Sequence, residues 1–305
     1  MHITSTPIWC DARRRRDVCF VSAADALQRG VHGQLIGTPT TLALLASKGD
    51  GDLAVPVRQR FTLGTVRLQL IPSGHGLGGA ALLADIAGKT VLYAGAVRTT
   101  VGGLGEPAEV RKADAVVVAA PFGDVGHAFP PLARVMDQTA AWSKAQLAAQ
   151  RRPVLFVDGL LDALEVAASL VARGIAVATS KTIRDAAARA NDLRIPALGG
   201  VAKEPRAIVW LDSDHAGLKR AIGKRHFATA LASGRALAEA KVIAAGYDAA
   251  FAWATAADRA QLLAWIDATS AKQIFVTGAC ADAIASAIGP RARVMGPPHQ
   301  MTLFG

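Results

Sequence analysis

The sequence predicts an α/β protein, and three observations carry this prediction. Short apolar runs alternate with alanine-rich segments of helical periodicity along most of the 305 residues. Hydrophobic residues make up 51% of the chain and charged residues 19%, which is typical of a globular protein with a substantial core. In the middle third, the runs follow a strand-helix-strand order that favours a parallel sheet.

The first part of the chain contains short apolar runs that we expect to be strands. They are residues 18–21, 33–36, 66–71, 80–86 and 90–93. Only short Gly- or Lys-bearing links separate the last three runs, so antiparallel pairing is expected there. Residues 38–46 predict a helix, with Thr38 as its N-cap and Pro39 in its first turn. Residues 115–119 form a fully apolar strand, and a turn follows.

The middle and last thirds alternate between helical and strand patterns. We expect helices at residues 135–150 and 160–173, the second ending at Gly174, and strands at 153–157, 175–179 and 207–211. A strand at 251–254, a helix at 257–268, a strand at 273–276 and a helix at 281–288 are expected to return the chain to its first domain.

The chain is strongly basic, with a formal net charge of +10. Such an excess favours polyanions, because neutralising phosphates releases counterions. An arginine- and alanine-rich composition with no functional meaning is the alternative explanation, and the arginine run could be a solvated face. The candidate nucleic-acid contacts are Arg13, Arg14, Arg15, Arg16, Lys219, Arg220, Lys224 and Arg225.

Other features indicate where the protein works. The sequence contains no apolar run of about 18 residues that could span a membrane, and its N-terminus does not resemble a secretory signal. Its three cysteines are scattered, without a C-x-x-C pair, which favours reduced thiols and excludes a zinc ribbon. We therefore expect a cytoplasmic protein without membrane contact.

Two neighbouring motifs carry a family resemblance. The segment Ile71-Pro-Ser-Gly-His75-Gly-Leu-Gly-Gly-Ala80 is followed by Thr90-Val-Leu-Tyr-Ala-Gly95-Ala96. Together they resemble the third and fourth motifs of the metallo-β-lactamase superfamily in its β-CASP nuclease branch, above all the ligase-associated DNA repair exonucleases and the RNA 3′-end processing nucleases. The resemblance implies that His75 stands at a zinc-ligand position and that Ala96 replaces a bridging aspartate.

Further segments resemble the family in family order, but with ligands replaced. An ungapped count places Ser22, Ala24, Ala26 and Leu27 at the H-x-H-x-D-H motif, and a shift of one residue would bring Asp25 to the aspartate position. Three other segments resemble the family as well. The segment around an acidic residue of the family is similar to residues 120–123. The opening of the β-CASP part is similar to residues 153–165, and its closing stretch to residues 217–234. Ala256 and Thr277 stand where the family has histidines, whereas Asp258 is retained.

The resemblance implies a metallo-β-lactamase αββα sandwich at residues 1–124 plus 239–305, with an inserted α/β β-CASP-like domain at 125–238. The two domains would enclose a cleft that in active relatives admits a nucleic-acid strand. Phosphodiester hydrolysis on this scaffold requires two divalent ions, each with about four donors. His75 supplies one donor, so we expect a catalytically inactive pseudo-nuclease with no catalytic residue, no metal and no cofactor.

Several motifs have a competing interpretation. His75 is interpreted as a structural histidine that fills a pocket or bonds a backbone carbonyl. The glycine-rich loop around His75 could cradle phosphate, but a tight turn is favoured because no helix or lysine follows. Asp212, Asp214 and His215 could form a relocated metal site, although a polar turn capping a helix near residue 216 is the simpler interpretation. Ser22 and Ser73 have no evident catalytic partners.

The functional expectation is a nucleic-acid-binding or partner-binding pseudo-nuclease in DNA repair or RNA processing. Its partner could be an active nuclease, a ligase or a helicase. The alternative is an active metal-dependent nuclease or hydrolase with a relocated or residual metal site. A purely structural subunit, which would have no affinity for nucleic acid, is a third possibility.

Overall fold

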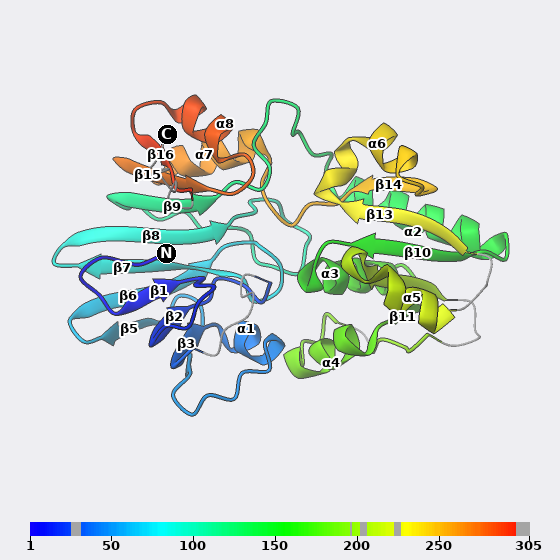
Figure 1. Cartoon of the computed structure of the whole chain (residues 1–305), viewed down its shortest axis with the longest axis horizontal. Coiled ribbons are helices and arrows are strands. Elements are labelled where there is room, and N and C mark those ends of the chain that lie inside the picture. Colours follow the sequence, from blue (N-terminus) through cyan, green and yellow to red (C-terminus); the bar gives the residue numbers. More distant parts are fainter. Residues whose placement is uncertain (26–31, 196, 202–205, 223–226, 297–305) are drawn as a thin grey trace, which may run out of the picture.

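The computed structural model describes residues 1–25, 32–195, 197–201, 206–222 and 227–296. It contains three β-sheets with helices packed against them, so the α/β class is confirmed (Figure 1). Two of the sheets lie in one half of the molecule and the third in the other half (Figure 1). Within the described part of the chain, no helix has both the length and the apolar character needed to cross a membrane.

The smallest sheet has four parallel strands in chain order: β1 (Ile8–Cys10), β2 (Val18–Phe20), β3 (Gln34–Gly37) and β4 (Leu53–Ala54). It packs face to face on the seven-stranded sheet. The shared core includes Ile8, Phe20 and Ile36 from the small sheet and Leu70 and Leu82 from the large one, all fully buried. Two apolar faces are thereby removed from water, which is the main stabilisation of such a sandwich.

The seven-stranded sheet has the order β16-β15-β9-β8-β7-β6-β5. Its strands are β5 (Arg60–Leu63), β6 (Val66–Pro72), β7 (Ala80–Ile86), β8 (Lys89–Ala96), β9 (Ala115–Ala119), β15 (Gln273–Thr277) and β16 (Ala292–Val294). The expected antiparallel pairing of β6, β7 and β8 is confirmed, and β8, β9, β15 and β16 run parallel. Helices α7 (Arg259–Ala268) and α8 (Ala281–Ile288) cover its outer face.

The third sheet is entirely parallel, as the strand-helix-strand order predicted, with the order β11-β12-β10-β13-β14. Its strands are β10 (Arg152–Val157), β11 (Val177–Thr179), β12 (Ala207–Leu211), β13 (Phe227–Ser233) and β14 (Ala249–Ala252). Helices α2 (Leu132–Ala148) and α3 (Leu160–Ala172) pack on one face. Helices α5 (His215–Ile222) and α6 (Glu239–Ala244) pack on the other.

Two of the remaining helices lie in different halves and contact each other. Helix α1 (Pro39–Leu44) begins as predicted, because the Thr38 side chain accepts a hydrogen bond from the Thr41 amide. It contacts α4 (Lys181–Ala190) of the other half, where the Arg189 guanidinium donates to the carbonyls of Ala43 and Leu44. Two short 3-10 helices, η1 (Asp212–Asp214) and η2 (Gly234–Leu237), follow β12 and β13.

Strand β14 belongs to the five-stranded sheet. Ala230 to Ser233 pair with Ala249 to Ala252, so this stretch does not join the first domain, where residues 239–305 were expected. The reason is local, because β14 follows α6 directly and continues the parallel sheet that β13 has begun. The sequence prediction also missed β1, β4, β5, β13, β16, α4 and α6, whose apolar patterns are short or interrupted.

A buried ion pair ties the two halves together. Arg98, which follows β8, donates two hydrogen bonds to Glu165 of α3, at 2.7 and 2.8 Å, and both side chains are 1% exposed. Glu165 also accepts from the Leu104 amide and the Trp253 indole, at 2.8 and 3.0 Å. These bonds hold the pKa of Glu165 below its usual range, against the opposing effect of burial. Arg98 Nε also donates to the Gly74 carbonyl at 3.1 Å, so the pair fixes the glycine loop between β6 and β7 against α3.

Candidate functional site

The candidate site lies where loops from both halves meet, in the centre of the molecule (Figure 1). Asp25 follows β2, His75 lies in the glycine-rich loop after β6, Asp162 occupies the first turn of α3, and Thr255 follows β14. Hydrogen bonds join these segments, although they are far apart in the sequence. The sequence singled out His75 and Asp25, and it gave no signal for Asp162 or Thr255.

His75 donates through both ring nitrogens. Its Nε2 lies 3.0 Å from a carboxylate oxygen of Asp25, and its Nδ1 lies 3.0 Å from the carbonyl oxygen of Thr255. Since both partners accept, both nitrogens carry protons and the ring is an imidazolium. Burial opposes this charge, but the Asp25 carboxylate outweighs burial and raises the pKa of His75 to about 9. The expectation of a histidine bonded to a backbone carbonyl is therefore confirmed.

Two carboxyl groups flank His75 in different protonation states. The imidazolium outweighs burial and holds the pKa of Asp25 below its ordinary value. Burial and the neighbouring Asp25 charge raise the pKa of Asp162 to about 7, although Thr255 donates a hydrogen bond to it at 2.9 Å. At neutral pH the site therefore contains one firm ion pair and one carboxyl group close to its titration midpoint.

The donor chemistry does not fit a pair of divalent ions. Both ring nitrogens of His75 are already engaged, with Asp25 and with the Thr255 carbonyl, so neither is directed at an open metal position. The side chains of Ala24, Ala96 and Ala256 end in methyl groups, which donate nothing. Ser22 is held elsewhere: its amide and hydroxyl donate to Asp11, at 2.9 and 2.6 Å. Asp11, which also accepts from Tyr93, is a residue that the sequence interpretation missed.

The glycine loop is a tight turn and not a phosphate cradle. The amides of His75, Gly76 and Gly79 donate inside the loop, to Ser73 Oγ, Gly74 O and Gly76 O respectively. Glycine is required at position 74, where φ is +76° and a Cβ atom would lie 1.9 Å from the Arg98 carbonyl oxygen. The loop thus positions His75, and these three backbone amides donate within the loop and not to a ligand.

A second polar network lies at the carboxyl edge of the five-stranded sheet. Arg235 donates to Asp158 and to Asp212, the latter at 2.9 Å, and Ser233 donates to Asp158. Asp212 also accepts from His215 Nε2 at 2.9 Å and from the Tyr247 hydroxyl. Carboxyl ends of parallel strands are common ligand sites, but here the polar groups satisfy one another.

The possible metal site at Asp212, Asp214 and His215 is not assembled as a ligand set. Asp212 faces His215, Tyr247 and Arg235, whereas Asp214 accepts from the Gly217 amide at 2.9 Å and from the Trp210 indole at 3.2 Å. The segment is a polar turn before a helix, as expected, and Asp214 is the residue that accepts a hydrogen bond from the first turn of α5.

Among the described residues, one group of three potential ligands lies within 4.8 Å: Asp124, His127 and Cys280. His127 Nδ1 already accepts from the amides of Gly123 and Asp124, both at 3.1 Å, so its lone pair is engaged. Burial raises the pKa of the Cys280 thiol, which favours the protonated form that binds metals poorly. The group does not form a ready metal centre.

The predicted basic contacts fall into two separate groups. Arg13, Arg14 and Arg15 are exposed in the turn between β1 and β2, whereas the Arg16 guanidinium stacks 3.7 Å above the Trp9 ring. Lys219 and Arg220 are exposed on α5, in the other half of the molecule (Figure 1). Lys224 and Arg225 lie outside the described residues. The two described groups therefore do not form one continuous patch.

Comparisons with known proteins add one finding. No family model matches the chain. A stretch of 167 residues is 28% identical to a protein of Opitutus terrae described as a probable DNA ligase. The match covers 53% of this chain and only 16% of that protein. The likeness therefore concerns a small part of a much longer relative.

Proposed function

We propose that this chain is a non-catalytic, nuclease-like protein that binds nucleic acid, with single-stranded DNA as its ligand and DNA strand repair as its setting. The proposal includes a metallo-β-lactamase-like sandwich with a β-CASP-like insertion. Packed sheets with outer helices and an all-parallel second part support this assignment, together with the motif order of the sequence.

The pair of contacts that engages both ring nitrogens of His75 is the observation that carries the non-catalytic part of the proposal. Donating on both nitrogens, this side chain acts as a built-in cation that neutralises Asp25. Metal-assisted hydrolysis needs lone pairs to hold the ion that activates water, and these residues offer too few. What remains is a folded scaffold whose basic surface attracts phosphates.

The choice of DNA has separate support. A segment similar to this chain forms 16% of a protein described as a probable DNA ligase, which favours DNA over RNA as the ligand. A DNA ligase, or an active nuclease or helicase of the same pathway, is the kind of protein partner we propose.

A salt titration tests the binding. We expect a labelled single-stranded oligonucleotide to bind the full chain, with an affinity that falls as salt rises from about 50 to about 200 mM. Simultaneous Arg13→Ala, Arg14→Ala and Arg15→Ala substitutions should weaken binding and lower the salt slope by about 1 for each phosphate that is no longer neutralised. Lys112→Ala, Lys144→Ala and Lys272→Ala remove the same charge from other exposed positions and serve as the control. Failure to bind DNA at low salt would reject the proposal.

Metal analysis and a nuclease assay test the loss of catalysis. We expect the purified protein to hold less than stoichiometric zinc or manganese and to leave single-stranded DNA uncut when either ion is added. Stoichiometric metal with cleavage would overturn the proposal. Loss of that metal in Cys280→Ser would then locate it at Asp124, His127 and Cys280, and loss in His75→Gln would locate it at the centre.

A further inference from the structure

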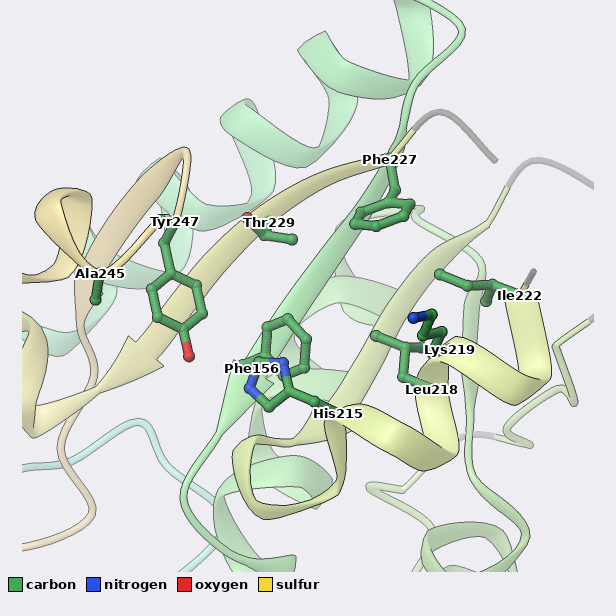
Figure 2. Close-up of a pocket in the computed structure, with 10 residues that line it drawn as sticks. Phe156, His215, Leu218, Lys219, Ile222, Phe227, Thr229, Ala245 and Tyr247 are labelled. Atoms are coloured by element: carbon green, nitrogen blue, oxygen red, sulfur yellow. The ribbon is translucent and has the colours of Figure 1, made fainter. Parts of the chain in front are cut away.

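A pocket of about 520 Å³ opens on the face of the five-stranded sheet that α5 and α6 cover (Figure 2). Phe156 of β10 and Thr229 of β13 form its floor. His215, Lys219 and Ile222 of α5 line one side. Tyr247 lines the other side, and Phe227 stands at one end (Figure 2). Its volume lies in the range of about 300–1,000 Å³ that is usual for small-molecule sites.

Aromatic rings dominate the walls of this pocket. The His215 ring stacks on Phe156, with centroids 4.2 Å apart and planes 14° apart, and Tyr247 meets Phe156 edge-on at 5.7 Å. Phe227 is 39% exposed, although it is a large apolar residue. Exposed ring faces around an open space favour a flat, conjugated ligand that can stack on them.

The rings are fixed before any ligand enters. Asp212 accepts from both the His215 ring and the Tyr247 hydroxyl, and its other oxygen accepts from Arg235. Burial and the bond to Asp212 raise the pKa of Tyr247 to about 12, so its hydroxyl remains a donor at neutral pH. A prearranged wall reduces the entropy that binding would otherwise lose.

Charge selects among flat ligands. Among the described residues that line the pocket, Lys219 is exposed and none carries a carboxylate. The nearby Asp212 carboxylate lies outside this lining and is paired with Arg235, which it shares with Asp158. A ligand with an aromatic ring and a negative group therefore fits better than a neutral or cationic one.

We propose that this pocket binds one nucleotide, with its base among Phe227, Tyr247 and His215 and its phosphate near Lys219. The inference rests on the proposed function, in which the nucleotide is an unstacked residue of bound single-stranded DNA. It adds a specific site to the general basic surface, and this site is distinct from Arg13, Arg14 and Arg15.

Free deoxyadenosine monophosphate tests the pocket itself. Ligand-observed saturation-transfer NMR with the full chain should show strongest transfer to the base protons, and weaker transfer to deoxyadenosine, which lacks the phosphate. Phe227→Ala should weaken binding about tenfold or more, and Lys219→Ala should abolish the preference for the phosphorylated ligand. Phe61→Ala removes a half-buried ring from β5 and should have no effect. Equal binding by wild type and Phe227→Ala would overturn the pocket assignment, and a melting curve of each variant establishes that it folds.

Single-stranded DNA separates this inference from the proposed function. Phe227→Ala should weaken DNA binding at every salt concentration without changing the salt slope, whereas the triple arginine variant changes the slope. DNA binding that depends on the arginines but not on Phe227 would leave the proposed function standing and reject the pocket. Binding of the free nucleotide without binding of DNA would keep the pocket as a nucleotide site and reject the proposed function.

Discussion

At the scale of single residues, His75 is held by two hydrogen-bond acceptors, one on each ring nitrogen. A neutral imidazole can ligate a metal through one nitrogen, whereas this ring gives both nitrogens to acceptors and carries a positive charge. The pKa values of Asp25 and Asp162 shift in opposite directions. Burial and the neighbouring Asp25 charge raise the pKa of Asp162, whereas the charge and hydrogen bond of His75 outweigh burial and lower the pKa of Asp25. The site is thus a proton-linked cluster whose charge depends on pH.

Ionisation of Asp162 should make the folded protein less stable above neutral pH than at pH 4. Its pKa in the folded state is about 7, above the ordinary value of 3.8, so the fold favours the protonated form. Stability is then lost as the pH rises from about 4 to about 7. Asp162→Asn keeps an acceptor for Thr255 and removes the charge. We expect it to stabilise the protein by on the order of 1–2 kcal/mol at pH 8 and to have little effect at pH 4, measured by thermal melting.

The control for this change is Asp50→Asn, which alters an exposed aspartate in a loop and should leave both melting temperatures unchanged. A lower melting temperature for Asp162→Asn at pH 8 would contradict the assignment.

The His75–Asp25 pair should contribute stability over a defined pH range. The pKa of His75 is raised from 6.5 to about 9, so its contribution is complete below about pH 6.5 and is lost as the pH rises through 9. We expect His75→Gln to cost about 1–3 kcal/mol at pH 6, and the difference from wild type to narrow by pH 10, measured by urea unfolding. A double-mutant cycle with Asp25→Asn should show coupling at pH 6. A cost that is independent of pH would argue for simple loss of packing.

The sequence could identify part of this site and not the rest. His75 stood out because it lies in a glycine-rich motif, and Asp25 because it lies beside the positions that the family resemblance assigned to ligands. Asp162 and Thr255 lie in or beside family-like segments, but neither stands at a ligand position of those segments, and their contact spans 93 positions. Protonation states depend on burial and neighbouring charges, which only the folded chain defines.

At the scale of secondary-structure elements, α1 and the glycine loop stabilise each other. The Thr38 hydroxyl caps α1, and the hydroxyls of Thr38 and Thr41 both lie 2.8 Å from the Gly78 carbonyl oxygen, to which they donate. The helix start therefore anchors the loop that carries His75. Both threonines are buried, so their bonds exclude water.

Removing this cap should loosen the loop as well as the helix. We expect Thr38→Ala to destabilise the protein by about 1–2 kcal/mol, because the Thr41 amide loses its partner. Thr38→Ser keeps the hydroxyl and should retain most of the stability. Hydrogen exchange should show faster exchange in both α1 and the loop for Thr38→Ala. Faster exchange in α1 alone would mean that the two elements are independent.

Elements with strong local signals were predicted well. Thr38 and Pro39 marked the start of α1, and the apolar runs of β6, β7, β9 and β10 were long enough to stand out. Strand β13 was missed because its alanine-rich sequence suits a helix equally well, and only pairing with β10 and β14 makes it a strand. The sheet membership of β14 likewise depends on its neighbours and not on its own residues.

At the scale of the whole molecule, the buried pair of Arg98 and Glu165 holds the two halves together. We expect Glu165→Gln to cost about 3–5 kcal/mol, because it leaves the Arg98 guanidinium buried without a counter-charge. Asp85→Asn breaks the exposed pair with Arg67 and should cost less than about 1 kcal/mol. Unfolding in urea, followed by circular dichroism, measures both. Equal costs for the two variants would show that the buried pair has no special role.

The junction around this pair is also filled with apolar side chains. Ala24, Leu77 and Leu104 from one half share a core with Leu161 and Trp253 from the other. Gly76 lies so close to α3 that a Cβ atom there would lie 2.8 Å from the Leu161 side chain. At this junction, apolar side chains therefore fill the space between the halves where a nucleic-acid cleft was expected.

This closure constrains how a polymer can reach the protein. A hinge motion that separated the halves would break the Arg98–Glu165 ion pair and expose the apolar side chains of the junction to water. Such a motion would amount to partial unfolding. In the proposed function, a DNA strand therefore runs over the outside of the molecule and not through this filled junction.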